Sequence, residues 1–240
     1  MKLGYLSTLY VALLTTGQLA PAQGNFQNLG FESATLVPVP GQPPYYDFAQ
    51  AFPSWTGFVR GVPDGLTGYN QLAMSIATFS ILDSAYKPLG GYGSSGGLIQ
   101  GNYSAVLMSG VSGPNQPSDA TLTQTGLVPT LANSMQFKAQ FAPFSSSGSW
   151  DVSLGGQALS LVPMSSGTNY TLYAADIHTF AGQTTELNFT VHSYPGQFAA
   201  DYLFLDSIQF SPQSIPEPSV FGLSALGALL LGWRIVRGRR

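Results

Sequence analysis

The C-terminal segment constrains the chain most, because it contains an apolar run that suits hydrocarbon rather than water. No charged side chain occurs from Ser219 to Trp233. A cluster of arginines follows directly: Arg234, Arg237, Arg239 and Arg240. A membrane-spanning helix needs about 20 apolar residues, so the span must extend to Val236 and let Arg234 reach back to the interface. We therefore expect a short transmembrane helix over residues 219–236 and a basic cytoplasmic tail at 237–240.

A proline-rich linker at residues 213–218 precedes this span. Pro216 and Pro218 flank Glu217 and keep the approach extended, since proline fixes φ and disfavours helix in the residue before it. The order of Pro-Glu-Pro, one apolar span and a terminal arginine cluster resembles the PEP-CTERM sorting signal of exported bacterial proteins. The resemblance implies anchoring in the inner membrane, recognition by the membrane protease exosortase, and association with exopolysaccharide or biofilm matrix. The alternative is an ordinary C-terminal anchor after a chance Pro-Glu-Pro.

The N-terminus carries a second targeting signal. Lys2 provides a positive charge, Leu3 to Leu14 form an apolar stretch, and Ala20 and Ala22 form a small-x-small cleavage site. This pattern is typical of a secretory signal peptide over residues 1–22, whose removal leaves Gln23 as the new N-terminus. An uncleaved N-terminal anchor is the alternative, and the short apolar core disfavours it.

The segment between the two signals is strongly acidic. Residues 23–215 contain ten acidic side chains and three basic ones, Arg60, Lys87 and Lys138, which gives a formal net charge of −7. Nucleic acid is therefore not expected as a partner, because phosphate backbones are bound by clustered Lys and Arg. The chain contains no cysteine, so a hydrophobic core, with or without a bound metal ion, must supply the stability that disulfides give other exported domains.

Local patterns in residues 23–212 indicate β-structure. Short segments rich in β-branched and aromatic residues alternate with Gly, Pro, Ser and Asn. In Ser134–Phe141 apolar and polar residues alternate, which predicts a strand with one buried face, and Tyr202–Phe210 is apolar on both faces, which predicts a central strand. Asp151–Leu159 predicts a hairpin that turns at Gly155 and Gly156. We therefore expect an all-β sandwich without a long soluble helix.

This ectodomain also carries a family resemblance. The motifs are Asn25–Glu32, Phe52–Trp55, Gly101–Leu107, Leu122–Gly126 and Phe204–Ile208. They are similar to the jelly-roll ectodomains of PEP-CTERM proteins, which in turn resemble galactose-binding-like carbohydrate-binding modules. The resemblance implies a jelly-roll β-sandwich and a structural Ca²⁺ held between the first and last strands by Glu32 and Asp206. Ser207 departs from the family's second acidic position, and a hydrogen-bonded carboxylate at Asp206 would serve as well.

Aromatic side chains suggest where a ligand could bind. They are frequent in the first third of the domain: Tyr45, Tyr46, Trp55, Phe58, Tyr69, Tyr86 and Tyr92. Flat rings flanked by polar residues suit stacking on the apolar faces of sugars. Tyr45, Tyr46 and Trp55 are the candidate ligand-binding residues. Core packing is the competing role, most strongly for Trp55.

Catalytic groups are scarce. Asp176 and His178 fall on one face of a predicted strand, where Ser160 or Ser165 could complete a Ser-His-Asp arrangement, but two surface polar residues are the simpler interpretation. The glycine-rich stretch at 90–97 fits dinucleotide and nucleophile-elbow patterns only in part, because no helix follows it, and it predicts a loop.

The sequence thus predicts an exported, C-terminally sorted surface or extracellular-matrix protein that is not an enzyme. Its ectodomain lies outside the cytoplasm, and its expected partners are the membrane, exosortase and extracellular polysaccharide. The alternative is a secreted hydrolase of polysaccharides or esters on a β-sandwich.

Overall fold

The structure is a computed structural model that describes residues 24–88, 96–112, 116–143, 148–194 and 200–215. The predicted signal peptide and its cleavage site, the Pro-Glu-Pro motif, the span at 219–236 and the terminal arginines lie outside the described residues. No helix within these described ranges is long and apolar enough to cross a membrane.

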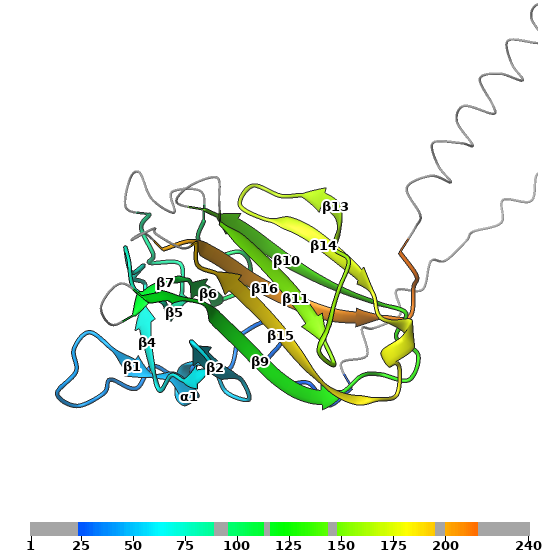
Figure 1. The fold of residues 1–240 in the computed structure, drawn as a ribbon, viewed down its shortest axis with the longest axis horizontal. Coiled ribbons are helices and arrows are strands. Elements are labelled where there is room, and N and C mark those ends of the chain that lie inside the picture. Colours follow the sequence, from blue (N-terminus) through cyan, green and yellow to red (C-terminus); the bar gives the residue numbers. More distant parts are fainter. Residues whose placement is uncertain (1–23, 89–95, 113–115, 144–147, 195–199, 216–240) are drawn as a thin grey trace, which may run out of the picture.

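Two large β-sheets form a sandwich in the described part of the chain (Figure 1). The eight-stranded sheet has the order β1 (Tyr46–Asp47), β4 (Leu66–Tyr69), β5 (Thr78–Leu82), β6 (Ser104–Met108), β16 (Tyr202–Ser211), β10 (Ser134–Ala142), β14 (Thr171–Asp176) and β13 (Val162–Ser166). The six-stranded sheet has the order β12 (Gln157–Ala158), β11 (Ser149–Leu154), β15 (Thr184–His192), β9 (Ala120–Leu127), β2 (Thr56–Val59) and β3 (Val62–Pro63). The all-β sandwich predicted from the sequence is confirmed.

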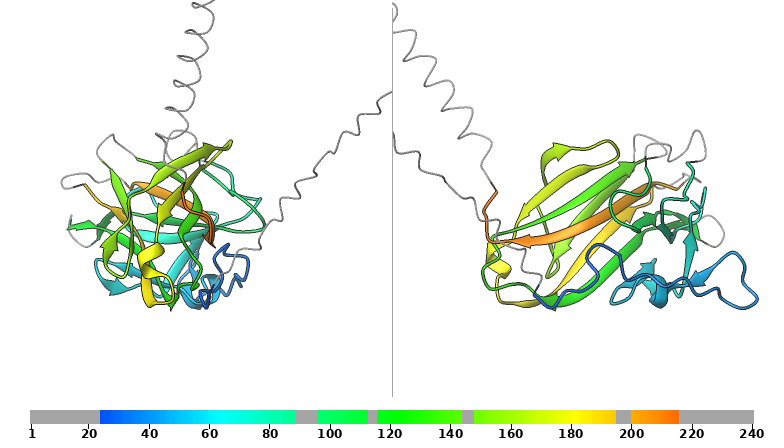
Figure 2. Two further views of the ribbon diagram at one scale, coloured as in Figure 1. Left: turned by 90° about the vertical axis from the view of Figure 1, so that its right-hand side faces the viewer. Right: turned by 180° about the vertical axis from the view of Figure 1, so that it is seen from behind.

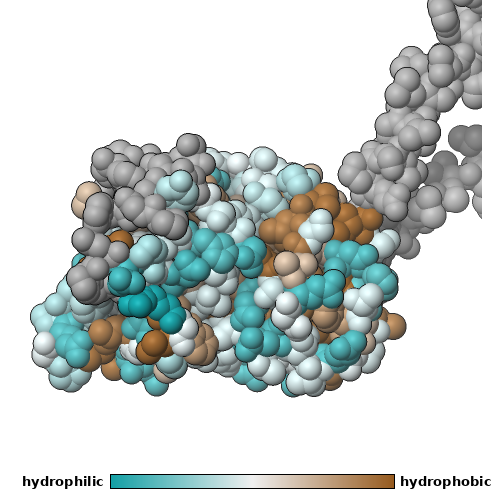
Figure 3. Space-filling model, viewed as in Figure 1, coloured by the Kyte–Doolittle hydropathy of each residue, from teal (hydrophilic) through white to brown (hydrophobic). Residues whose placement is uncertain are grey.

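Smaller elements complete the fold. β7 (Gly110–Ser112) and β8 (Gln116–Ser118) pair with each other, and the helical elements among the described residues are α1 (Phe48–Ala51) and the 3₁₀ turn η1 (His178–Phe180). β4 and β5 run parallel, whereas the other paired strands run antiparallel. In the view of Figure 3, hydrophilic and hydrophobic residues are interspersed, and the hydrophobic ones gather in separate patches.

The strands follow the sequence pattern closely. On β10 Met135, Phe137 and Ala139 are fully buried, while Gln136 and Lys138 on the other face are half-buried. β16 lies between β6 and β10 and runs the length of the sandwich beside β10 (Figure 2), as its two apolar faces require. The β11–β12 hairpin turns at Gly155 and Gly156, both with positive φ, 59° and 76°. Glycine tolerates that conformation without a steric cost.

The eight-stranded sheet is buried on both sides near β6. Ala105 and Leu107 face the core between the sheets, where Phe189 of the other sheet also packs. Val106 and Met108 point away from the core and join a second apolar cluster. Because this outer cluster must be shielded from water, the irregular segments after β4 and β5 pack over it, with Leu72 and Tyr86 among the covering side chains. These covering segments create the cavities described next.

Candidate functional site

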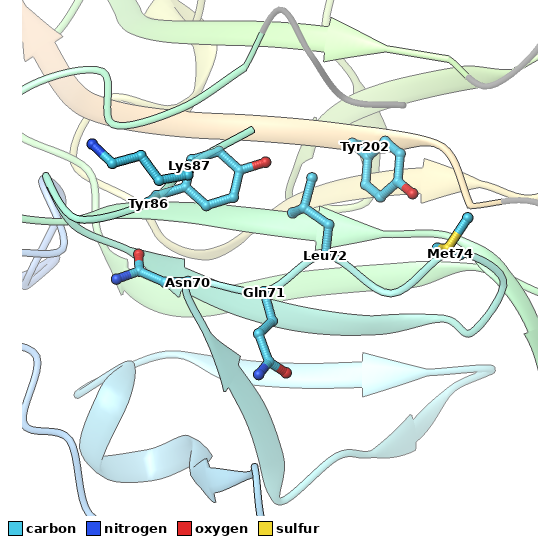
Figure 4. Close-up of a pocket in the computed structure, with 7 residues that line it drawn as sticks. All are labelled: Asn70, Gln71, Leu72, Met74, Tyr86, Lys87 and Tyr202. Carbon is cyan, nitrogen blue, oxygen red and sulfur yellow. The ribbon is translucent and has the colours of Figure 1, made fainter. Parts of the chain in front are cut away.

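A cavity of about 400 Å³ lies over the outer face of the eight-stranded sheet. The segment after β4, the segment after β5 and the start of β16 contribute its lining (Figure 4). The lining residues are Asn70, Gln71, Leu72, Met74, Tyr86, Lys87 and Tyr202. Aromatic and aliphatic groups therefore share the cavity with two amides and an ammonium, the mixed lining that small-molecule sites use.

Tyr86 is the unusual group in this cavity. Its side chain is 8% exposed, and its buried hydroxyl has no hydrogen-bond partner among the described residues. Figure 4 shows the hydroxyl directed toward Leu72, another residue that lines the cavity. Burial raises the pKa of Tyr86, so the phenol stays neutral and can both donate and accept. A buried hydroxyl without a partner costs about 1–3 kcal/mol, and a ligand hydroxyl could remove that cost.

Tyr202 fixes one wall of the cavity. Its hydroxyl donates to the carbonyl oxygen of Ala73 at 3.0 Å, which ties the segment after β4 to β16. Burial, with smaller contributions from Tyr86 and Asp201, raises the pKa of Tyr202 to about 12. Tyr202 therefore lines the cavity while its hydroxyl is already engaged.

A carboxylate network positions Asn70 at the edge of the cavity. Asp83 accepts from Asn70 Nδ2 at 2.7 Å, from Ala85 N at 2.7 Å and from the Tyr69 hydroxyl. Asn70 Oδ1 in turn accepts from Asp83 N at 2.9 Å. Burial acts to raise the pKa of Asp83, but these hydrogen bonds outweigh it and hold the pKa below the ordinary value of 3.8. The network fixes Asn70 in a left-handed conformation, φ 52°, which asparagine adopts more readily than most residues.

A second cavity of about 420 Å³ adjoins the first. Gln71, Leu72 and Met74 line both cavities, so the segment that carries them is a shared wall. The second cavity is further lined by Tyr45, Asp64, Leu66, Gly68, Ala73, Ser75, Ile76, Ala77, Thr78, Phe79 and Met108.

The structure separates the three aromatic residues predicted to bind ligand. Tyr45, 36% exposed, lines the second cavity. Tyr46 packs edge-on against Tyr69 with ring centroids 5.6 Å apart. Trp55 is 4% exposed and lies in the core, where its indole N–H donates to the carbonyl oxygen of Asn28 at 3.1 Å. The core-packing role that competed for Trp55 is therefore the one its position supports.

Most residues of the first cavity have no distinguishing signal in the sequence. Tyr86 is one of many aromatic residues, and no motif marks Asn70, Lys87 or Tyr202 as a candidate for ligand binding. Tyr86 and Lys87 follow β5, whereas Tyr202 begins β16, so no local spacing relates them. The available signal was the outward-facing apolar residues of β6, which require a cover on the outer face of the sheet.

The two predicted calcium ligands both lie near Gly30, and both accept hydrogen bonds. Asp206 accepts from Ser104 Oγ at 2.7 Å, Gln100 N at 3.0 Å and Ser207 N at 2.5 Å. Glu32 accepts from Asn102 N at 2.9 and 3.0 Å, from Asn102 Nδ2 at 2.9 Å and from Tyr103 N at 3.4 Å. The N–H groups among these donors cannot ligate a cation.

The described ranges also contain no group of three His, Cys, Asp or Glu residues that could hold a metal ion. The hydrogen bonds to Asp206 fit the alternative of a hydrogen-bonded carboxylate at that residue. A calcium ion at these residues stays a prediction of the family resemblance.

His192 connects three parts of the six-stranded sheet. It ends β15, and its Nδ1 lies 2.9 Å from Asp119 Oδ2, just before β9, while its Nε2 lies 2.5 Å from Asp151 Oδ2 on β11. Ser193 N also donates to Asp119 Oδ1 at 2.8 Å. Because both ring nitrogens face carboxylates, this arrangement favours the doubly protonated, positively charged imidazole. With both nitrogens engaged, His192 acts as a structural clamp.

The clamp predicts a pH-dependent stability. Burial acts to lower the pKa of His192, but the hydrogen bonds to Asp151 and Asp119 outweigh it and raise the pKa above 6.5. The native state thus binds the proton more tightly, so the stabilisation is complete below about pH 6.5 and is lost as pH rises through the native pKa. Between about pH 6 and pH 9 the urea midpoint of the wild type should fall further than that of His192→Asn. An equal fall in both proteins would contradict the clamp.

The predicted acid–base pair is exposed and incomplete. Asp176 ends β14 and His178 begins η1, so they do not share a strand face, although Asp176 Oδ1 and His178 Nδ1 lie 2.7 Å apart. Their side chains are 64% and 62% exposed. Within the described ranges, no hydrogen bond joins Ser160 or Ser165 to His178. The pair has the form of a surface interaction.

Comparison with known proteins finds similarity only at the level of structure. No family model matches the sequence, and no curated protein matches it either. The chain is similar to the carbohydrate-binding module TmCBM61, solved with β-1,4-galactotriose, with a TM-score of 0.44 and 12% identity over 80% of this chain and 100% of that one. It is also similar to the enzymatically active domain of tailspike protein 4 of bacteriophage CBA120, with a TM-score of 0.39 and 15% identity over 78% of this chain and 21% of that one. At these scores neither likeness bears on the ligand.

Proposed function

We propose that this chain is an exported, non-catalytic surface or matrix protein whose β-sandwich binds carbohydrate in the cavity beneath Tyr86. The observation that carries the proposal is the buried Tyr86 hydroxyl, which is directed toward the cavity-lining Leu72 and has no partner among the described residues. Such a group is costly unless something binds to it.

The chemistry of the cavity suits a sugar. A sugar ring presents apolar C–H faces and hydroxyl edges, and it needs apolar surface and hydrogen-bonding groups side by side. Leu72 and the rings of Tyr86 and Tyr202 offer the apolar surface, while the amides of Asn70 and Gln71 offer the hydrogen-bonding groups. The acidic charge of residues 23–215 disfavours a polyanion such as nucleic acid.

The predicted N- and C-terminal signals support the proposed export and sorting of the protein. The signal peptide at 1–22 would export the domain, and the Pro-Glu-Pro motif, the apolar span and the arginines would hold it in the inner membrane until exosortase processes it. Fractionation of the native host tests this directly. Intact, unprocessed chains in the cytosol would contradict it.

Binding is tested with the full-length protein in detergent, first on a glycan array and then by titration calorimetry against the polysaccharide that binds best. Tyr86→Phe keeps the ring and removes only the hydroxyl, so we expect an affinity about 2- to 12-fold weaker, the value of one hydrogen bond of about 0.5–1.5 kcal/mol. Because the lost hydroxyl was unpaired, the unfolding midpoint should stay or rise.

The matched control is Tyr194→Phe, which changes an exposed tyrosine that lines neither cavity. It should bind as the wild type does. Binding to no glycan, or equal binding by Tyr86→Phe, would refute the proposed site.

A further inference from the structure

We infer that the two cavities form one continuous site, so that the ligand is a chain-like oligosaccharide lying across the segment Gln71–Met74. This inference rests on the proposed function and specifies the class of ligand. It starts from the shared wall: Gln71, Leu72 and Met74 line both cavities. Separate ligands on the two sides would contact the same three side chains, and each would lose its own translational freedom.

The dimensions favour a ligand longer than one sugar. The cavities measure about 400 and 420 Å³, and each alone lies within the range of about 300–1,000 Å³ that single small-molecule sites occupy. A monosaccharide in the first cavity would leave the second unfilled. A linked chain can place consecutive units in both with a single association step.

Large apolar side chains are exposed on the shared wall and in the second cavity. Met74 on the shared wall is 63% exposed, and Ile76 and Tyr45 in the second cavity are 53% and 36% exposed. Large apolar groups that cluster on a surface indicate binding. Asp64, half-buried in the second cavity, adds a carboxylate whose pKa burial raises, and it accepts from Leu66 N at 3.1 Å. The second cavity thus repeats the combination of apolar surface and hydrogen-bonding groups found in the first.

The shared wall is held in place before any ligand binds. Ala73 accepts from the Tyr202 hydroxyl at 3.0 Å, and its N–H contacts Met108 Sδ at 3.2 Å. Met74 and Ser75 carbonyl oxygens accept from Ala200 N at 3.0 Å and Val111 N at 2.8 Å. Because this segment is already held at successive residues, little free energy is lost to ordering it when a ligand binds, and this favours an extended ligand.

The experiment is titration calorimetry of the full-length protein in detergent with β-1,4-linked galacto- and gluco-oligosaccharides, from disaccharide to hexasaccharide. We expect affinity to rise about tenfold or more with length, as contacts in the second cavity are added. Tyr45→Ala should weaken hexasaccharide binding about fivefold or more and leave disaccharide binding within about twofold. Tyr86→Phe should weaken both by the same factor.

Controls separate this inference from the proposed function. Tyr194→Ala removes an exposed tyrosine, 47% exposed, that lines neither cavity, and should change neither affinity. Affinity that does not depend on length, or a Tyr45→Ala effect that is equal for short and long ligands, would overturn the continuous site while leaving carbohydrate binding intact. Binding of neither oligosaccharide series would overturn the continuous site for these sugars, and a glycan array without binding would overturn the proposed function as well.

Discussion

Asp206→Ala is expected to lower the free energy of unfolding by about 3 kcal/mol, since it leaves buried donors without an acceptor. The carboxylate is 1% exposed and receives hydrogen bonds from Ser104 Oγ, Gln100 N and Ser207 N. Ser104 is itself fully buried, so water cannot replace the lost acceptor there. Urea unfolding followed by tryptophan fluorescence measures the change.

The control for this prediction is Asp176→Ala. The Asp176 side chain is 64% exposed and pairs only with an exposed histidine, so its loss should cost no more than about 0.5 kcal/mol. A loss of less than about 1 kcal/mol for Asp206→Ala would show that the donors find other partners.

The Asp206 carboxylate should also make the free energy of unfolding depend on pH in the acidic range. Burial raises the pKa of Asp206 from 3.8 to about 6, against the hydrogen bonds that lower it. The native state therefore binds the proton more tightly than the unfolded state does. Protonated Asp206 thus contributes stability below about pH 4, and this contribution is lost as pH rises through about 6. Asp206→Asn should remove this part of the pH profile.

Calcium can be tested on the same proteins. If hydrogen bonds satisfy Glu32 and Asp206, the unfolding midpoint of the wild type should be equal in excess calcium and in EDTA. A calcium-dependent rise that Glu32→Gln abolishes would instead establish the ion predicted from the family resemblance.

The sandwich could be predicted because burial imposes a period on each strand. The alternation of apolar and polar residues in β10 identifies a strand with one solvent-facing side, and apolar residues on both faces of β16 identify a central strand. The Gly155–Gly156 turn was recognisable because its positive φ angles favour glycine. Each of these signals lies within a few consecutive residues.

The site could not be predicted, because its residues meet through tertiary structure alone. The segments that carry Asn70 and Tyr86 have no regular period, and their role is to cover the outward face of β6. The clamp formed by Asp119, Asp151 and His192 likewise joins the start of β9 to β11 and β15, which become neighbours only after the sheet has formed. Aromatic residues alone could not distinguish Tyr45, on a cavity, from Trp55, in the core.

Trp55→Ala is expected to lower the free energy of unfolding by about 3–5 kcal/mol, the usual cost of truncating a large buried aromatic residue. Trp55 packs against Phe31 and Phe189, with ring centroids 5.7 and 6.4 Å away. Its indole N–H also satisfies the Asn28 carbonyl oxygen. The substitution therefore leaves both a cavity between the sheets and an acceptor without its donor. Urea unfolding monitored by far-UV circular dichroism measures the loss.

Tyr45→Ala is the matched comparison that separates a core role from a binding role. Tyr45 is 36% exposed and lines the second cavity, so its removal should change stability by no more than about 1 kcal/mol while weakening the binding of long oligosaccharides. Trp55→Ala should show the reverse: a large loss of stability and unchanged affinity under conditions where the variant is folded. If Trp55→Ala instead kept its stability and lost its affinity, the indole would have to face a ligand. That result is incompatible with a side chain that is 4% exposed between two sheets.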